Sequence, residues 1–134
     1  MKSLILEATE FTPKVEFSPD AHTFELSGVS MPEDAAAFYR QILDWLNAYK
    51  ENVVNNNTGT YNLIRLNFKL AYCNSASAKF LLSILEKLKA FKDSGHNLEI
   101  NWYYDAGDDL MLDDGRDLSE TINMSFNFLP VIKT

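Results

Sequence analysis

Two short segments near the start of the chain alternate between apolar and polar residues, which is the pattern of strands with one buried face. Val15 and Phe17 alternate with polar neighbours, and Phe24 and Leu26 do the same after the turn-like sequence SPDAH. Because two such runs are separated only by turn-forming residues, we predict a β-hairpin.

The pattern then changes to a helical period. Apolar residues recur at helical spacing between Ala35 and Tyr49, and Ser30 lies three residues before Glu33, the arrangement of a capping box. We predict a long amphipathic helix from about Met31 to Glu51. The sequence NNNTGT at residues 55 to 60 is a loop by composition.

The middle of the chain contains one more strand and one more helix. Residues from Ile64 to Leu70 alternate again, which predicts a strand with one buried face. A helical stripe then includes Leu81 and Leu88 and ends at Gly95, a residue suited to a helix C-terminus. We expect this second helix to begin near Ser75.

The last third of the chain predicts two further strands. Residues from Leu98 to Tyr104 alternate, and FNFLPVI at residues 126 to 132 has the composition of an edge strand. Between them we expect an acidic loop that ends in a short helix capped by Asp117 and Glu120. The whole order predicts an α/β fold in a single domain over residues 1–134, with the helix-linked strands parallel.

Composition and charge exclude several classes of protein. The chain has 134 residues, 46% of them hydrophobic, which is enough for one folded core. Its net charge of −7 repels nucleic acid and anionic lipid, so we expect no nucleic-acid partner. The apolar run near the N-terminus is too short for a signal peptide, and no 18 apolar residues run together. We expect a cytoplasmic protein with no membrane insertion.

Common catalytic signatures are absent from the sequence. It contains no Gly-rich phosphate loop, no GxSxG and no HExxH. His22 and His96 have ordinary turn neighbours, so we interpret both as solvated loop residues. The single cysteine, Cys73, cannot form an internal disulfide, which fits a reducing compartment. We therefore expect a protein that is not an enzyme and that has no cofactor and no structural metal.

The most unusual composition lies between Asp105 and Glu120, where seven acidic residues accompany a single base, Arg116. Such a segment could hold a hard cation, but neither Gly107 nor Gly115 fits the calcium-loop pattern. We interpret it as a solvated acidic loop with candidate contacts to a partner or a metal at Asp105, Asp108, Asp109, Asp113 and Asp114.

The junction Asn74-Ser75-Ala76-Ser77 lies where a strand is followed by a helix. Asn and Ser are preferred helix caps, because their side-chain oxygens accept hydrogen bonds from the first backbone amides. A hydroxyl at this position is also a candidate phosphorylation site, because a phosphate at a helix N-terminus meets free amides and the positive end of the helix dipole. Composition alone leaves both interpretations open.

Several separated segments resemble one known family. They are SGVSMPEDAAAFYRQILDWL, AYCNSASAKFLLSIL, INWYYDAGDDLML and the closing FNF, together with Thr12-Pro13. In this order and over nearly the whole chain, they are similar to the SiaC family of bacterial regulatory phosphoproteins. That resemblance implies a mixed β-sheet with helices packed against it, as in anti-sigma-factor antagonists (the STAS fold).

The resemblance also implies a function. The family's junction reads Asn-Thr-Ser-Ser-x-Lys, with the phosphoacceptor directly after Asn, and this position is Ser75 here. Ser replaces Thr, and Ala76 replaces the following Ser, whereas Asn74, Ser77 and Lys79 are kept. By resemblance, these three residues bind partners near the phosphosite. The implied partners are a Ser/Thr protein kinase, a PP2C-type phosphatase and a diguanylate cyclase.

Two other functions remain open from the residues themselves. One is an acidic-loop metal-binding protein. The other is a small-ligand-binding module with a pocket between sheet and helices, lined by an aromatic stripe. The candidate lining residues are Trp102, Tyr104, Phe126 and Phe128.

Overall fold

Six strands lie in one sheet in the same order as in the sequence. The computed structural model describes residues 1–55 and 62–132. Its strands are β1 (Leu4–Leu6), β2 (Lys14–Ser18), β3 (Thr23–Ser30), β4 (Leu63–Cys73), β5 (Asn97–Asp105) and β6 (Asn127–Val131). Its helices are α1 (Ala35–Asn55), α2 (Ser75–Asp93) and α3 (Asp109–Ile122). The loop predicted at residues 55–60 lies outside the described residues, except for Asn55, which ends α1.

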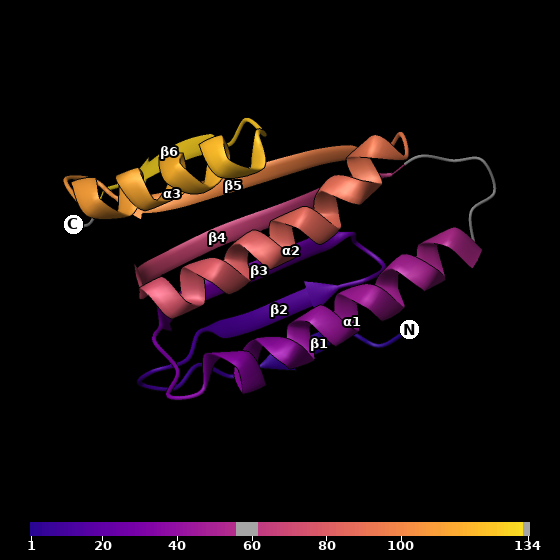
Figure 1. Cartoon of the computed structure of the whole chain (residues 1–134), viewed down its shortest axis with the longest axis horizontal. Helices are drawn as coiled ribbons and strands as arrows, with labels where there is room; N and C mark the ends of the chain where they lie inside the picture. Colours follow the sequence, from indigo (N-terminus) through magenta and orange to yellow (C-terminus); the bar gives the residue numbers. More distant parts are fainter. Residues whose placement is uncertain (56–61, 133–134) are drawn as a thin grey trace.

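The sheet is mixed. β1, β2 and β3 pair antiparallel, whereas β3, β4, β5 and β6 pair parallel. Each parallel pair is joined through one helix, and each connection moves one strand further in the same direction. Because crossover connections share one hand, the three helices cover the same face of the sheet, as Figure 1 shows. The predicted α/β class, hairpin and parallel strands are confirmed.

The core lies between this face and the helices. Alternate apolar residues of β3 and β4 point into it and have at most 3% of their surface exposed, as the sequence pattern predicts. On β4 these residues are Ile64, Leu66, Phe68 and Leu70. From the helices, the largest buried residues include Tyr39, Ile42, Leu46, Tyr49, Leu81, Ile84 and Leu85.

The start of α1 differs from the prediction. The helix begins at Ala35, and Asp34 caps it by accepting a hydrogen bond from the amide of Ala37 at 3.0 Å. The predicted capping box of Ser30 and Glu33 is wrong, because Ser30 is the last residue of β3 and its side chain is fully buried.

The acidic segment is not a loop. Residues 109 to 122 form α3, a helix of 14 residues, and Asp108 caps it by accepting a hydrogen bond from the amide of Met111 at 3.1 Å. Its buried residues are Met111, Gly115, Leu118 and Ile122, which recur at helical spacing and pack against the sheet. This apolar stripe outweighs repulsion among the exposed carboxylates, so the predicted loop, and a helix start at Asp117, are wrong.

The turn-forming neighbours of the two histidines predicted that both are solvated, but His96 is buried and His22 is half-buried. His96 is 6% exposed, and its Nδ1 accepts a hydrogen bond from the amide of Asn62 at 3.1 Å. His22 is half-buried, with its Nδ1 2.5 Å from the hydroxyl of Tyr49. Both corrections arise because contacts distant in sequence decide burial.

Candidate functional site

The start of α2 is held by the side chain of Asn74. Its Oδ1 accepts a hydrogen bond from the amide of Ser77 at 2.8 Å, as an N-cap residue does. The Asn74 amide donates to the carbonyl of Ser30 at 3.0 Å, which ties the junction to the end of β3. The predicted helix start near Ser75 is confirmed, and the cap is Asn74.

A buried hydroxyl network fixes the same turn on its core side. The Ser77 Oγ donates to the Ser30 carbonyl at 3.1 Å and accepts from the Ser30 Oγ at 2.8 Å. The Tyr39 hydroxyl lies 2.5 Å from the Ser30 Oγ, so α1, β3 and α2 meet at this point. Burial raises the pKa of Tyr39 to about 12, which keeps its hydroxyl protonated within the network.

Ser77 is therefore buried, whereas the family resemblance implied that it contacts partners. Its side chain is 0% exposed, so it is removed from any surface that a partner can contact. Its hydrogen bonds instead position the first turn of α2. Asn74 is half-buried and Lys79 is exposed, so both remain candidates for partner contacts.

Ser75 is the first residue of α2 and is exposed. Its neighbours Asn74 and Ser77 are both fixed by hydrogen bonds, so its own backbone has little freedom. Lys79 lies one turn further along the same helix face, and Tyr72, which precedes the junction, is 50% exposed. The site is thus a rigidly presented hydroxyl one helical turn from a cation, and an exposed aromatic residue precedes it in the sequence.

A cavity connects this junction with the acidic helix. It has a volume of about 320 Å³ and lies between the first turns of α2 and the middle of α3. Ser75 and Lys79 line it from α2, and Asp114 and Asp117 line it from α3. β4 and β5 are parallel neighbours, so the helices that follow them begin at the same edge of the sheet.

Two groups at this cavity have shifted pKa values. Burial, together with the nearby carboxylate of Asp114, raises the pKa of the Cys73 thiol to about 12, so Cys73 stays protonated. Partial burial raises the pKa of Asp114, and the negative charges of Asp117, Asp108 and Asp113 add to that effect. The cavity therefore disfavours additional negative charge on its α3 side.

The other predicted acidic residues lie along the outer side of α3 and before it. Asp109 is in the first turn, where a carboxylate is favourable to the helix dipole, and Asp113 lies 3.9 Å from Arg116. Asp105 ends β5, and Asp108 is the cap. Over residues 1–55 and 62–132, no three His, Cys, Asp or Glu side chains are grouped to hold a metal ion.

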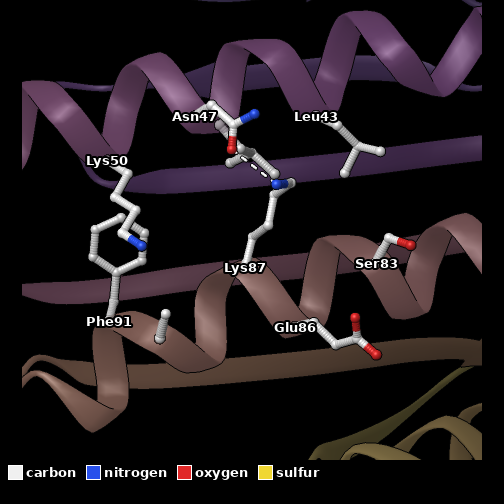
Figure 2. Close-up of a pocket in the computed structure, with 9 residues that line it drawn as sticks. Leu43, Asn47, Lys50, Ser83, Glu86, Lys87 and Phe91 are labelled. Carbon is white, nitrogen blue, oxygen red and sulfur yellow. Dashed lines mark hydrogen bonds between the residues drawn. The ribbon is translucent and has the colours of Figure 1, made fainter.

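A second hollow lies between α1 and α2, at a distance from the junction. Leu46 and Phe91 are buried at this groove of about 460 Å³, and Figure 2 shows Lys87 reaching across it, where its Nζ donates to the Asn47 Oδ1 at 2.8 Å. Lys50 also lies beside the groove, close to Phe91 in this view.

The aromatic stripe predicted to line a ligand pocket belongs mainly to the core. Trp102 is 1% exposed and stacks at 6.4 Å on Phe126, which is 7% exposed, and Phe128 packs on Phe126 at 6.0 Å. Tyr104 is half-buried against the same core. Trp102 also lines the 320 Å³ cavity at the junction, whereas Tyr104 lines a separate hollow with Lys69 and Val131, so the stripe is divided between the core and two different hollows.

The fold and this junction define a single-sheet α/β protein with a presented hydroxyl. A model of the family described as "SiaC family regulatory phosphoprotein" matches residues 6–131. The chain therefore belongs to the SiaC family of regulatory phosphoproteins.

Relatives and solved structures agree with that assignment. An uncharacterised protein of Pseudomonas aeruginosa (strain UCBPP-PA14) is 22% identical over 126 residues, which are 94% of each chain. The crystal structure of apo-SiaC from Pseudomonas aeruginosa is 24% identical and has a TM-score of 0.73, with both chains covered completely. SiaC in a crystal structure with the diguanylate cyclase SiaD, which it activates, is 22% identical with a TM-score of 0.79; 97% of this chain and 99% of that one are covered. These similarities confirm the fold.

In residues 1–55 and 62–132, no helix combines the length and the apolar character that crossing a bilayer requires.

Proposed function

We propose that the chain is a switch protein that a Ser/Thr protein kinase phosphorylates on Ser75 and that a PP2C-type phosphatase returns to its unmodified state. The phosphorylation state selects the partner, and one such partner is a diguanylate cyclase. The protein acts by stoichiometric binding in the cytoplasm and performs no turnover of its own.

The presentation of Ser75 carries this proposal. A kinase and a phosphatase must both reach the hydroxyl, and Ser75 is exposed at the first position of a helix. The fold can also accept the product, because a phosphate at a helix N-terminus meets backbone amides that have no partner within the helix. Asn74 and Ser77 hold this turn in place, so we expect modification to leave the first turn of α2 intact.

The family supports the regulatory role. Its members are described as regulatory phosphoproteins, and in one of the two crystal structures above SiaC is bound to the diguanylate cyclase SiaD. At Ser75 a partner of the unmodified state would meet a bulky group carrying about −1.5 to −2 charges. Tyr72, half-exposed beside the junction, offers an apolar contact that such a partner would lose at the same time.

Two experiments test this function. Mass spectrometry of the protein from its own cells should find one phosphate on the peptide that contains Ser75. In binding assays, Ser75→Asp should weaken the affinity for the partner of the unmodified state by about tenfold or more, whereas Ser75→Ala should retain that affinity. Ser125→Asp adds the same charge at another exposed serine and should have no effect. If phosphorylated and unmodified protein bind candidate kinase, phosphatase and cyclase equally well, the switch proposal is wrong.

A further inference from the structure

The phosphate proposed for Ser75 would not lie in a purely attractive environment. The amides at the start of α2 and the ammonium of Lys79 favour it, but the opposite wall of the same 320 Å³ cavity carries Asp114 and Asp117. Before phosphorylation, these side chains amount to one positive and two negative charges. A phosphate brings the local sum from −1 to about −3.

We expect this repulsion to move α3 rather than to displace the phosphate. Hydrogen bonds of Asn74 and Ser77 fix the first turn of α2, and the helix amides hold a phosphate beside that turn instead of releasing it to solvent. Asp114 is already disfavoured as a charged group, because partial burial and three neighbouring carboxylates raise its pKa. Of the two walls of the cavity, we therefore expect the α3 wall to move.

Contacts between α3 and the sheet show how such a movement would be detected. The indole N–H of Trp102 donates to the Met111 carbonyl at 3.0 Å, so one buried side chain of β5 is bonded to the first half of α3. At the other end of the helix, the Lys89 Nζ donates to the Ile122 carbonyl at 3.0 Å. A displacement that begins at Asp114 would therefore open the Met111 end, while Lys89 retains the C-terminal end.

We infer that α3 is the element that responds to phosphorylation of Ser75, and that Asp114 and Asp117 are the residues through which it responds. This inference rests on the proposed function, because it requires a phosphate at Ser75. It makes the acidic helix part of the switch: the modification alters the position of a second helix as well as the charge of the first.

The two indole N–H groups provide the measurement. Protein with phosphoserine incorporated at position 75 during synthesis is compared with unmodified protein by ¹H–¹⁵N spectra of the tryptophan side chains. The Trp102 signal should shift, and its exchange with deuterium should become about tenfold faster or more, because α3 opens more often. Trp45 donates to the Lys2 carbonyl at 3.0 Å, far from the junction in sequence, and serves as the internal reference that should not change.

Charge-neutral variants show whether the carboxylates transmit the effect. In the double variant Asp114→Asn and Asp117→Asn, phosphorylation should leave the Trp102 signal nearly unchanged. Asp109→Asn with Glu120→Gln is the matched control, and the full response should remain in it. Both residues are exposed on α3, neither lines the cavity, and neither is among the carboxylates that raise the pKa of Asp114. As a test without substitution, raising the salt concentration from about 0.05 to 1 M should reduce the response of phosphorylated wild-type protein, because salt screens the repulsion.

The outcomes separate this inference from the proposed function. The inference is overturned if phosphorylation leaves the Trp102 signal unchanged, even when it still changes partner binding. It is also overturned if the Trp102 signal of the double variant Asp114→Asn and Asp117→Asn responds to phosphorylation as fully as that of wild type. A Trp102 response without any change in partner binding supports the inference and overturns the switch function instead.

Discussion

Ser75 and Ser77 are separated by one residue, and the structure gives their hydroxyls opposite environments. Ser75 is exposed, whereas Ser77 is 0% exposed and bonded to Ser30 through both of its hydrogen-bonding capacities. Ser77→Ala should lower the free energy of unfolding by about 1–3 kcal/mol, because two buried hydrogen bonds to Ser30 are lost, one to its carbonyl and one from its hydroxyl.

The matched control is Ser75→Ala, which should stay within about 0.5 kcal/mol of wild type because no buried partner is lost. Urea unfolding of both variants measures the difference. Equal losses in the two variants would contradict the assignment of Ser77 as a structural anchor and Ser75 as a free hydroxyl.

His22 makes stability depend on pH. Burial lowers its pKa, the charge of His96 lowers it further, and Asp20 acts in the opposite direction. Since the unfolded chain titrates near the ordinary value of about 6.5, it binds more protons than the folded chain just below that pH. Stability should therefore fall as the pH drops from about 7.5 to 5.5.

His22→Asn should remove part of this pH dependence, and Asn tolerates the positive φ of 51° at this position. Tyr49→Phe is the control, since it deletes the hydroxyl that contacts His22 but keeps the titrating imidazole. Urea unfolding at both pH values gives the two slopes. A slope in His22→Asn as steep as in wild type would show that other groups cause it.

At the level of single residues, the sequence predicted what depends on near neighbours. The capping character of Asn74 and the start of α2 follow from residue type and spacing, and both are confirmed. The buried role of Ser77 could not be predicted, because its partner Ser30 lies 47 residues away and only the packing of β3 against α2 brings them together. The same reason explains His96, because the backbone amide that donates to its ring belongs to Asn62, 34 residues away.

At the level of elements, α3 is the helix that the sequence pattern did not predict; most of it was predicted as a loop. Many Asp residues gave the segment a loop-like composition, since Asp is a poor helix former. A signal was present nevertheless: Met111, Gly115, Leu118 and Ile122 are spaced by four, three and four residues. The glycine in that series made the apolar stripe hard to recognise, because glycine has no side chain and is not counted among the apolar residues of a helical pattern.

Gly115 is needed because α3 lies directly on an indole ring. A Cβ at this position would be 2.6–2.7 Å from ring atoms of Trp102. Gly115→Ala should therefore destabilise the protein by about 1–3 kcal/mol through overpacking, even though Ala is the better helix former. Arg116→Ala, the next and exposed residue, should be nearly neutral, and thermal unfolding compares the two. A stabilised Gly115→Ala variant would mean that α3 and Trp102 are not in close contact.

At the level of the whole molecule, the three helices leave the other face of the sheet without helical cover in the described residues. That face carries polar contacts that cross the strands. Arg65 pairs with Glu99, and the Lys69 Nζ lies 2.9 Å from the Glu25 Oε1 and over the ring of Tyr103. Such contacts satisfy charged groups on a flat surface that would otherwise favour association between sheets.

A ladder of asparagine side chains is the most buried part of that polar face. The Asn101 Nδ2 donates to the Asn67 Oδ1 at 2.8 Å, and the Asn127 Nδ2 donates to the Asn101 Oδ1 at 2.9 Å, so the ladder spans β4, β5 and β6. Asn67 and Asn101 are only 9% and 7% exposed, although none of the three described helices covers them. Parallel pairing in register places the three residues side by side.

The middle residue should matter most, because it alone bonds to both neighbours. Asn101→Ala should lower the free energy of unfolding by about 1–3 kcal/mol, since the buried amide of Asn67 loses its partner and cannot regain it fully from water. Asn97→Ala is the matched control: it lies on the same strand and, by alternation, on the same face, but it is exposed, and the change should stay within about 0.5 kcal/mol. Urea unfolding measures both variants. If Asn101→Ala is as mild as Asn97→Ala, the ladder does not stabilise the fold, and the uncovered face holds its strands together through backbone pairing alone.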